Sequence, residues 1–71
     1  MKGFSFLVNS KTARICEAYA KRQDVTIDEA MKVFLASCTF RTLNDAETGL
    51  YLEVFEFVYD MFLEETGVVF E

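Results

Sequence analysis

The chain has 71 residues, of which 52% are hydrophobic and 15% are aromatic, and it carries a formal net charge of −5. A chain of this length is expected to form one helical domain over residues 1–71, with a core that hides only about 60% of the surface exposed on unfolding. Histidine is absent, which removes the commonest general base and the commonest metal ligand near neutral pH. Composition therefore argues against an enzyme and predicts no cofactor and no metal ion.

Charge is unevenly distributed along the chain. Residues 1–22 carry five basic residues and one acid, a balance of +4, whereas residues 23–71 carry two basic residues and eleven acids, a balance of −9. We expect the two regions to attract each other within the fold or across a dimer, and the acidic region disfavours nucleic acid. The alternative is that the basic region favours an anionic partner.

Two classes of segment are not recognisable in the sequence. Charged residues interrupt every apolar run well short of the roughly 20 residues of a membrane span, and no signal peptide is evident. The sequence therefore predicts a cytoplasmic protein without a membrane partner, in which Cys16 and Cys38 are reduced thiols. Both cysteines are placed on apolar helix faces, where we expect them to be buried as small hydrophobic residues.

The first predicted element is a helix with an ambiguous start. Polar residues recur at spacings of three and four between Ser10 and Lys21, which is typical of one helical face, and the helix is expected to end near Asp24. Residues 4–8 alternate in a β-prone run. They form either a short amino-terminal strand or the first turns of the helix, and a strand would have residues 68–70 as its pairing partner.

The second predicted helix has the clearest start in the chain. Thr26 and Glu29 have the spacing of a capping box, in which each side chain accepts a hydrogen bond from the backbone N–H of the other residue. The inward stripe of this helix is predicted to consist of Ala30, Val33, Phe34 and Ser37 or Cys38.

The remaining elements follow from glycines and periodicity. Residues 40–43 are predicted to form a short helical turn, and residues 44–49 a connection in which Gly49 adopts a left-handed conformation. A last helix is expected over residues 53–65, with Gly67 as its carboxyl-terminal glycine.

The last helix carries the predicted interaction surface. Its acids lie in one narrow stripe that is expected to face solvent, whereas eleven of the fourteen positions from 50 to 63 are apolar. A helix this apolar is surrounded on most sides, so we predict that part of it contacts another chain. The predicted surface consists of Tyr51, Phe55, Val58, Tyr59 and Phe62. The alternative is a monomer in which residues 1–8 and 68–70 cover this helix.

Several fragments together resemble a known group of proteins. The chain is similar to small uncharacterised bacterial proteins, a domain of unknown function, some of which look like companions of ADP-ribosyltransferase-like toxins. These relatives have Ser-Pro where this chain has Val54-Phe55. The resemblance implies an antitoxin or accessory role and transfers no catalytic residue. The fragments that carry it are Tyr19-Ala20-Lys21, Asp28-Glu29-Ala30, Ser37-Cys38-Thr39-Phe40, Leu43, Glu47-Thr48-Gly49-Leu50-Tyr51 and Val58-Tyr59-Asp60-Met61-Phe62.

The sequence as a whole predicts an all-α protein, a compact bundle of three main helices and one short helix. Its predicted function is that of a non-catalytic protein-interaction module, as a homodimer or as a small accessory partner of another protein. The alternative is a ribbon-helix-helix-like DNA-binding regulator, because a strand over residues 4–8 followed by two helices has that order. Neither face of such a strand offers Arg or Lys to DNA bases.

Overall fold

The computed structural model describes residues 2–67, and their secondary structure is helical. The elements in chain order are α1 (Lys2–Gln23), α2 (Ile27–Leu35), α3 (Cys38–Leu43), the short 3₁₀ helices η1 (Ala46–Thr48) and η2 (Leu50–Leu52), and α4 (Phe55–Thr66). The predicted bundle of three main helices, α1, α2 and α4, with the short helix α3, is confirmed. No helix between residues 2 and 67 is both long enough and apolar enough to cross a membrane.

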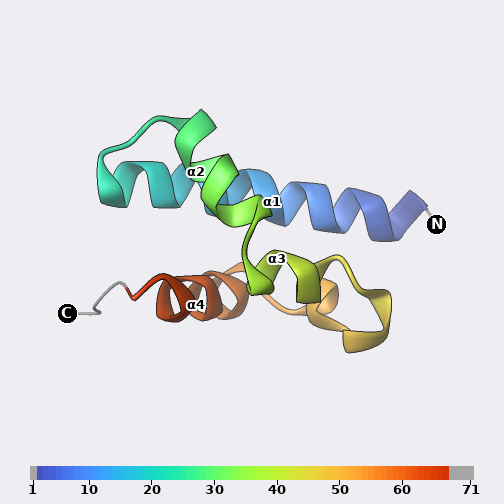
Figure 1. Cartoon of the computed structure of the whole chain (residues 1–71). Coiled ribbons are helices and arrows are strands. Elements are labelled where there is room, and N and C mark those ends of the chain that lie inside the picture. The colour runs from blue at the N-terminus through green and yellow to red at the C-terminus, as the bar shows by residue number, and fades with distance from the viewer. Residues whose placement is uncertain (1, 68–71) are drawn as a thin grey trace.

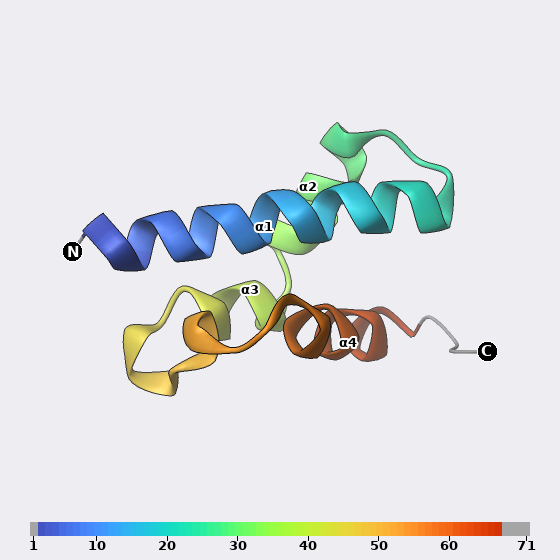
Figure 2. The same ribbon diagram turned by 180° about the vertical axis from the view of Figure 1, so that it is seen from behind.

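The helices form two layers. The long helix α1 runs across the molecule, and α2 folds back against it after a short turn (Figure 1). Seen from behind, α3, η1, η2 and α4 line the other side of α1 (Figure 2). The amino-terminal half of α1 lies beside η1 and η2, and its carboxyl-terminal half lies beside α4. The long helix α1 therefore contacts α2 as well as η2 and α4.

Residues 4–8 belong to α1, so the strand alternative is wrong. The helical period places Phe4 and Val8 one turn apart on the same face. Val8 is buried, and the Phe4 ring meets the Tyr51 ring edge-on at a centroid distance of 4.7 Å. These tertiary contacts favour helix over the β propensity of the segment. Residues 68–70, the pairing partner expected for the strand, lie outside the described residues.

The first turn between helices depends on a left-handed residue. Asp24 has a φ of 57°, a conformation that aspartate tolerates better than most residues. The backbone N–H of Val25 then donates to the carbonyl of Ala20 at 3.0 Å, which closes the end of α1. The chain reverses here and starts α2 against α1.

The capping box of α2 is confirmed. The Thr26 hydroxyl accepts a hydrogen bond from the Glu29 backbone N–H at 3.1 Å, and the Glu29 carboxylate accepts one from the Thr26 N–H at 3.1 Å. The helix ends at Leu35, before Ser37 and Cys38 of the predicted inward stripe, because the Ser37 hydroxyl caps α3 by accepting from the Phe40 N–H at 3.1 Å.

The last helix begins two residues later than predicted. Residues 50–52 form η2, and Val54 is the extended residue that precedes α4. The left-handed glycines are confirmed, with φ of 73° at Gly49 and 82° at Gly67. Glu53 therefore lies in the connection rather than in the helix.

The core lies between the two layers and is rich in aromatic rings. The Phe34 ring from α2 meets the Phe62 ring from α4 at 4.9 Å and the Phe40 ring from α3 at 5.5 Å. Tyr19 of α1 contacts Phe62 from the other side at 4.9 Å. Phe34 and Phe62 are fully buried, so this aromatic cluster joins all four α-helices.

Candidate interaction surface

Of the five residues of the predicted interaction surface, two lie in the hydrophobic core and three lie at the edge of that core. Val58 and Phe62 have no exposed surface and belong to the core. Tyr51, Phe55 and Tyr59 are half-buried and pack against that core. The two core residues face the interior of the folded chain, so they offer nothing to a partner.

The half-buried aromatic residues at this edge are covered mainly by α1. Tyr51 lies under Phe4, and the Arg14 guanidinium lies 4.4 Å from the centre of the Phe55 ring, a cation–π contact. Phe55 also stacks on Tyr59 at 5.3 Å, and burial raises the pKa of the Tyr59 hydroxyl. Of the two segments in the monomer alternative, residues 1–8 thus contribute Phe4, which contacts Tyr51 of η2 rather than α4, and residues 68–70 lie outside the described residues. The contact to α4 comes from Arg14, further along α1.

The acidic stripe at the end of the chain faces solvent, as predicted. Its four members are exposed: Glu53, Glu56, Asp60 and Glu64. Among the described residues, no group of three or more His, Cys, Asp or Glu side chains is placed to hold a metal ion. Glu56, Asp60 and Glu64 form a solvated surface of α4, and Glu53 lies in the connection before it.

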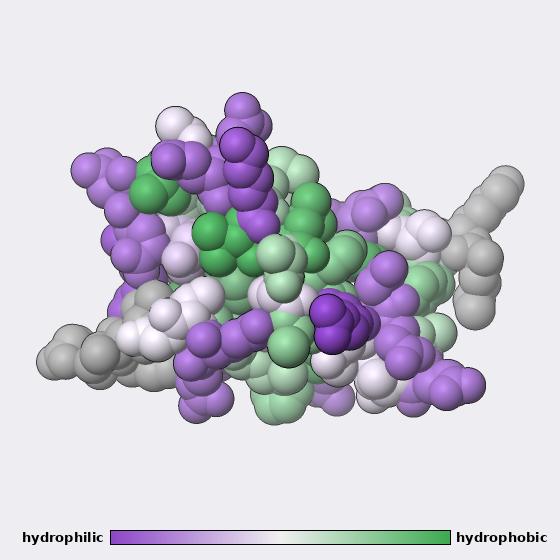
Figure 3. Space-filling view, in the orientation of Figure 1, coloured by the Kyte–Doolittle hydropathy of each residue, from purple (hydrophilic) through white to green (hydrophobic). Residues whose placement is uncertain are grey.

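Helix α2 carries a row of exposed apolar side chains on the outside of the bundle. Ile27 is 49% exposed, Met31 38% and Leu35 46%, and their spacing of four residues places them along one side of the helix. We call these three residues the α2 row. Hydrophobic surface gathers over the part of the molecule where α2 lies (Figure 3). An apolar row in the middle of a face is the feature expected of an interaction surface.

An open groove runs beside the α2 row, between α2 and α1. It has a volume of about 370 Å³. The Thr12 side chain is 9% exposed, and its hydroxyl has no hydrogen-bond partner among the described residues. Cys16 is buried in the same wall, and burial raises the pKa of its thiol. The α1–α2 groove is lined by Asn9, Thr12, Ala13 and Cys16 from α1 and by Ile27 and Met31 from α2.

The sequence contains a periodic pattern that matches the α2 row, but the predicted inward stripe was assigned to other residues of the same helix. Ile27, Met31 and Leu35 recur every four residues, which is as periodic as the stripe itself. Val33, which was predicted to face inward, is 42% exposed, whereas Ala30 and Phe34 are buried as predicted. A nine-residue helix packed on one side buries few side chains, so most of its apolar residues remain outside.

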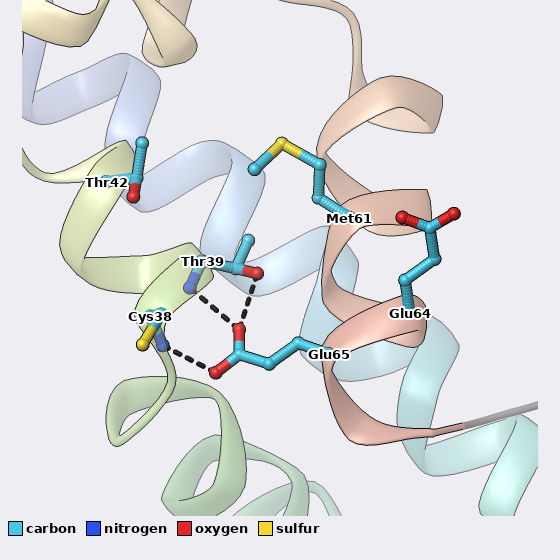
Figure 4. Close-up of a pocket in the computed structure, with 6 residues that line it drawn as sticks. All are labelled: Cys38, Thr39, Thr42, Met61, Glu64 and Glu65. Atoms are coloured by element: carbon cyan, nitrogen blue, oxygen red, sulfur yellow. Dashed lines mark hydrogen bonds between the residues drawn. The ribbon is translucent and has the colours of Figure 1, made fainter.

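A second hollow lies where α3 meets α4, and a carboxylate from α4 caps α3 there (Figure 4). Glu65 accepts hydrogen bonds from the backbone N–H groups of Cys38 at 2.7 Å and Thr39 at 2.9 Å, and from the Thr39 hydroxyl at 2.8 Å. Together with the Ser37 cap, these bonds satisfy the first three free N–H groups of α3. This contact could not be predicted from sequence, because its partners lie 26 and 27 residues apart.

The capping bonds lower the pKa of the Glu65 carboxyl, above all the bond from the Cys38 backbone N–H. They also place Cys38 at the surface, so the prediction that both cysteines are buried is wrong for Cys38 and confirmed for Cys16. The reason is local: Cys38 is the first residue of α3, where its backbone faces Glu65 and its side chain stays outside the core. The Glu65 contact is a structural clamp between two helices.

Comparison of the chain with models of protein families, with curated proteins and with solved structures finds no significant match in any of the three. The resemblance to small bacterial companions of toxins therefore stays a prediction. The surface of the molecule itself offers the exposed side chains of the α2 row beside the α1–α2 groove.

Proposed function

We propose that this chain is a non-catalytic protein-interaction module that binds its partner through the α2 row and the α1–α2 groove. The observation that carries the proposal is the exposure of Ile27, Met31 and Leu35 in one continuous row. Leaving apolar area in water forfeits about 25 cal/mol for each Å², and a row beside a groove has the shape that a helix of another chain fills.

The rest of the molecule supports a role in binding rather than in catalysis. The chain has no histidine, so a hydroxyl or thiol nucleophile would lack its commonest activating base. The hydrogen bonds of Glu65 are committed to the cap of α3. The ribbon-helix-helix alternative loses its structural basis, because residues 4–8 form the start of α1.

The proposal predicts that the wild-type protein either associates or binds a hydrophobic dye, and that the α2 row is responsible. Sedimentation equilibrium at tens of micromolar detects association, and the fluorescence of an anilinonaphthalene dye reports free apolar surface. We expect Leu35→Lys to reduce whichever signal the wild type gives, with an unchanged circular dichroism spectrum.

The matched control is Phe57→Lys, because Phe57 is 49% exposed, close to the 46% of Leu35, but lies on α4. The control should leave both signals near the wild-type level. A wild-type protein that sediments as a monomer and binds no dye would overturn the proposed function, as would equal effects of the two substitutions.

A further inference from the structure

We infer that the outer face of α4 binds a further partner, a segment of another protein that forms a basic amphipathic helix. This inference goes beyond the proposed function, because α4 belongs to the layer on the other side of α1 from α2 (Figure 2). We call this surface the α4 face. It consists of an apolar row, Val54, Phe57 and Met61, and of an acidic row beside it, Glu53, Asp60 and Glu64.

The apolar row follows one side of α4. Val54 precedes the helix and is 64% exposed, Phe57 is 49% exposed, and Met61 is half-buried. The Phe57 N–H donates to the Val54 carbonyl at 3.1 Å, so these two residues lie one turn apart, and Met61 follows one turn later. Met61 points from α4 towards α3, whereas the Glu64 carboxylate points away from α3 (Figure 4). The row therefore borders the hollow between α3 and α4, which has a volume of about 370 Å³.

The acidic row flanks Phe57 without a cation from its own segment. Asp60 and Glu64 follow Phe57 by three and seven residues, which makes them its neighbours on the helix surface, and both are exposed. Residues 42–67 contain seven acids and no lysine or arginine. Arg14 covers Phe55, which lies on nearly the opposite side of α4 from Phe57, and Arg41 of α3 does not line the hollow. The segment from η1 to the end of α4 therefore brings only negative charge to the apolar row.

Charge complementarity selects the occupant of the α4 face. A second copy that packed the same face here would bring its acidic row against this one in either direction, which is repulsive. Apolar side chains at spacings of three and four fit the apolar side of a partner helix. Lysine or arginine along one edge of that helix would meet Asp60 and Glu64, as opposite charges do beside the apolar seam of paired helices. The partner that fits is therefore both apolar and basic.

The same charge separates the α4 face from the dye measurement of the proposed function. The anilinonaphthalene dye is an aromatic sulfonate, and carboxylates beside Phe57 repel an anion. The dye therefore reports the α2 row, and a cationic probe is needed for the α4 face.

The test uses a labelled model peptide of about 18 residues, with Leu at every third or fourth position and Lys along the edges of this apolar side. Fluorescence anisotropy at about 50 mM salt should give a dissociation constant in the micromolar range, at least about threefold weaker at about 300 mM salt. The same peptide with Glu in place of Lys is the control for the probe and should bind at least about tenfold more weakly.

Two pairs of variants locate the binding surface. Asp60→Lys should weaken binding of the basic peptide about tenfold, whereas Asp28→Lys, the same charge change on an exposed residue of α2, should change it less than about twofold. Phe57→Ala should also weaken binding about tenfold. Leu35→Ala, which removes a side chain of similar exposure from α2, should leave it near the wild-type value. Circular dichroism verifies that each variant is folded.

The outcomes separate this inference from the proposed function. Equal effects of Asp60→Lys and Asp28→Lys would mean that the peptide responds to net charge alone, and equal effects of Phe57→Ala and Leu35→Ala would place it elsewhere; either result overturns the inference. Self-association that Asp60→Lys abolishes would make the basic α1 of a second copy the occupant and overturn a separate partner. A basic peptide that does not bind overturns this inference and leaves the proposed function standing. A monomer that binds no dye, yet binds the peptide through Phe57, does the reverse.

Discussion

The two thiols of the chain lie in different surroundings, and the difference is large enough to measure. Cys16 is 1% exposed, and burial raises the pKa of its thiol, whereas Cys38 is exposed at the start of α3. The reactive species is the thiolate. Cys16 is therefore protected twice, because a reagent cannot reach it and because its raised pKa keeps the thiol protonated. We expect a thiol reagent to label Cys38 rapidly in the native protein and Cys16 only on unfolding.

Mass spectrometry of the labelled protein at successive times measures this. The Cys38→Ser variant provides the control, because its remaining thiol should stay unlabelled until denaturant is added. Rapid labelling of that variant in native buffer would show that the wall of the α1–α2 groove opens at Cys16.

Glu65 joins α4 to α3 through its charge, so its contribution to stability depends on pH. Its pKa is lowered in the folded state, chiefly by the bond from the Cys38 N–H. A lowered pKa means that the stabilisation is fully present above the unfolded value of about 4.3 and is lost as the pH falls through the lower folded value. The carboxylate is exposed, so solvent screening keeps the effect modest.

We expect Glu65→Gln to lower the free energy of unfolding by about 1 kcal/mol at pH 7, the usual size of a lost helix cap. Urea unfolding at pH 7 and pH 3 measures this, and the difference from the wild type should shrink at pH 3. The neighbouring exposed residue supplies the control, since Glu64→Gln should change stability little at either pH. A deficit of equal size at both pH values would refute a charge-dependent clamp.

At the scale of single elements, the capping box of α2 supplies a prediction with a close control. Thr26→Ala removes the hydroxyl that accepts from the Glu29 N–H and should lower the free energy of unfolding by about 1 kcal/mol. Thr26→Ser keeps an acceptor at the same place and should remain close to the wild type. Urea unfolding followed by circular dichroism compares the two, and an Ala variant as stable as the Ser variant would contradict the cap.

Elements whose starting contacts lie close together in the sequence were predictable, whereas those that depend on distant contacts were not. The start of α2 depends on Thr26 and Glu29, three residues apart, so the sequence contains both partners of the contact. The start of α1 depends on the contact of Phe4 with Tyr51, which joins distant parts of the chain. Residues 4–8 alone fit a period of two as well as a helical period, and the tertiary contact favours the helix.

The interaction surface was less predictable than the fold for a related reason. A period of four identifies one side of a helix but not whether another element covers that side. Phe62 and Leu35 are both apolar and periodic, yet Phe62 is fully buried against rings from α1 and α2, whereas Leu35 is 46% exposed. The exposed apolar row lies on α2 rather than on α4, because Val58 and Phe62 of α4 are buried in the core and Arg14 of α1 covers Phe55.

At the scale of the whole molecule, one aromatic cluster connects the two layers. Phe34 is fully buried and meets Phe40 and Phe62, so α2, α3 and α4 share one contact point. A domain of 71 residues has a free energy of unfolding of about 4 to 11 kcal/mol. Truncating a buried phenylalanine to alanine costs about 3 to 5 kcal/mol, which is a large part of that total.

We therefore expect Phe34→Ala to unfold most or all of the molecule at 25 °C, and the milder Phe34→Leu to fold with about 1 kcal/mol less stability. Circular dichroism reports all helices, and tyrosine fluorescence reports the surroundings of the tyrosines on α1, η2 and α4. The two signals of Phe34→Leu should follow a single urea transition, because loss of the shared contact weakens both layers together. Phe6→Leu, at a position 71% exposed, should change stability by less than about 0.5 kcal/mol. Separate transitions for the two signals would mean that the layers fold independently and that the cluster does not join them.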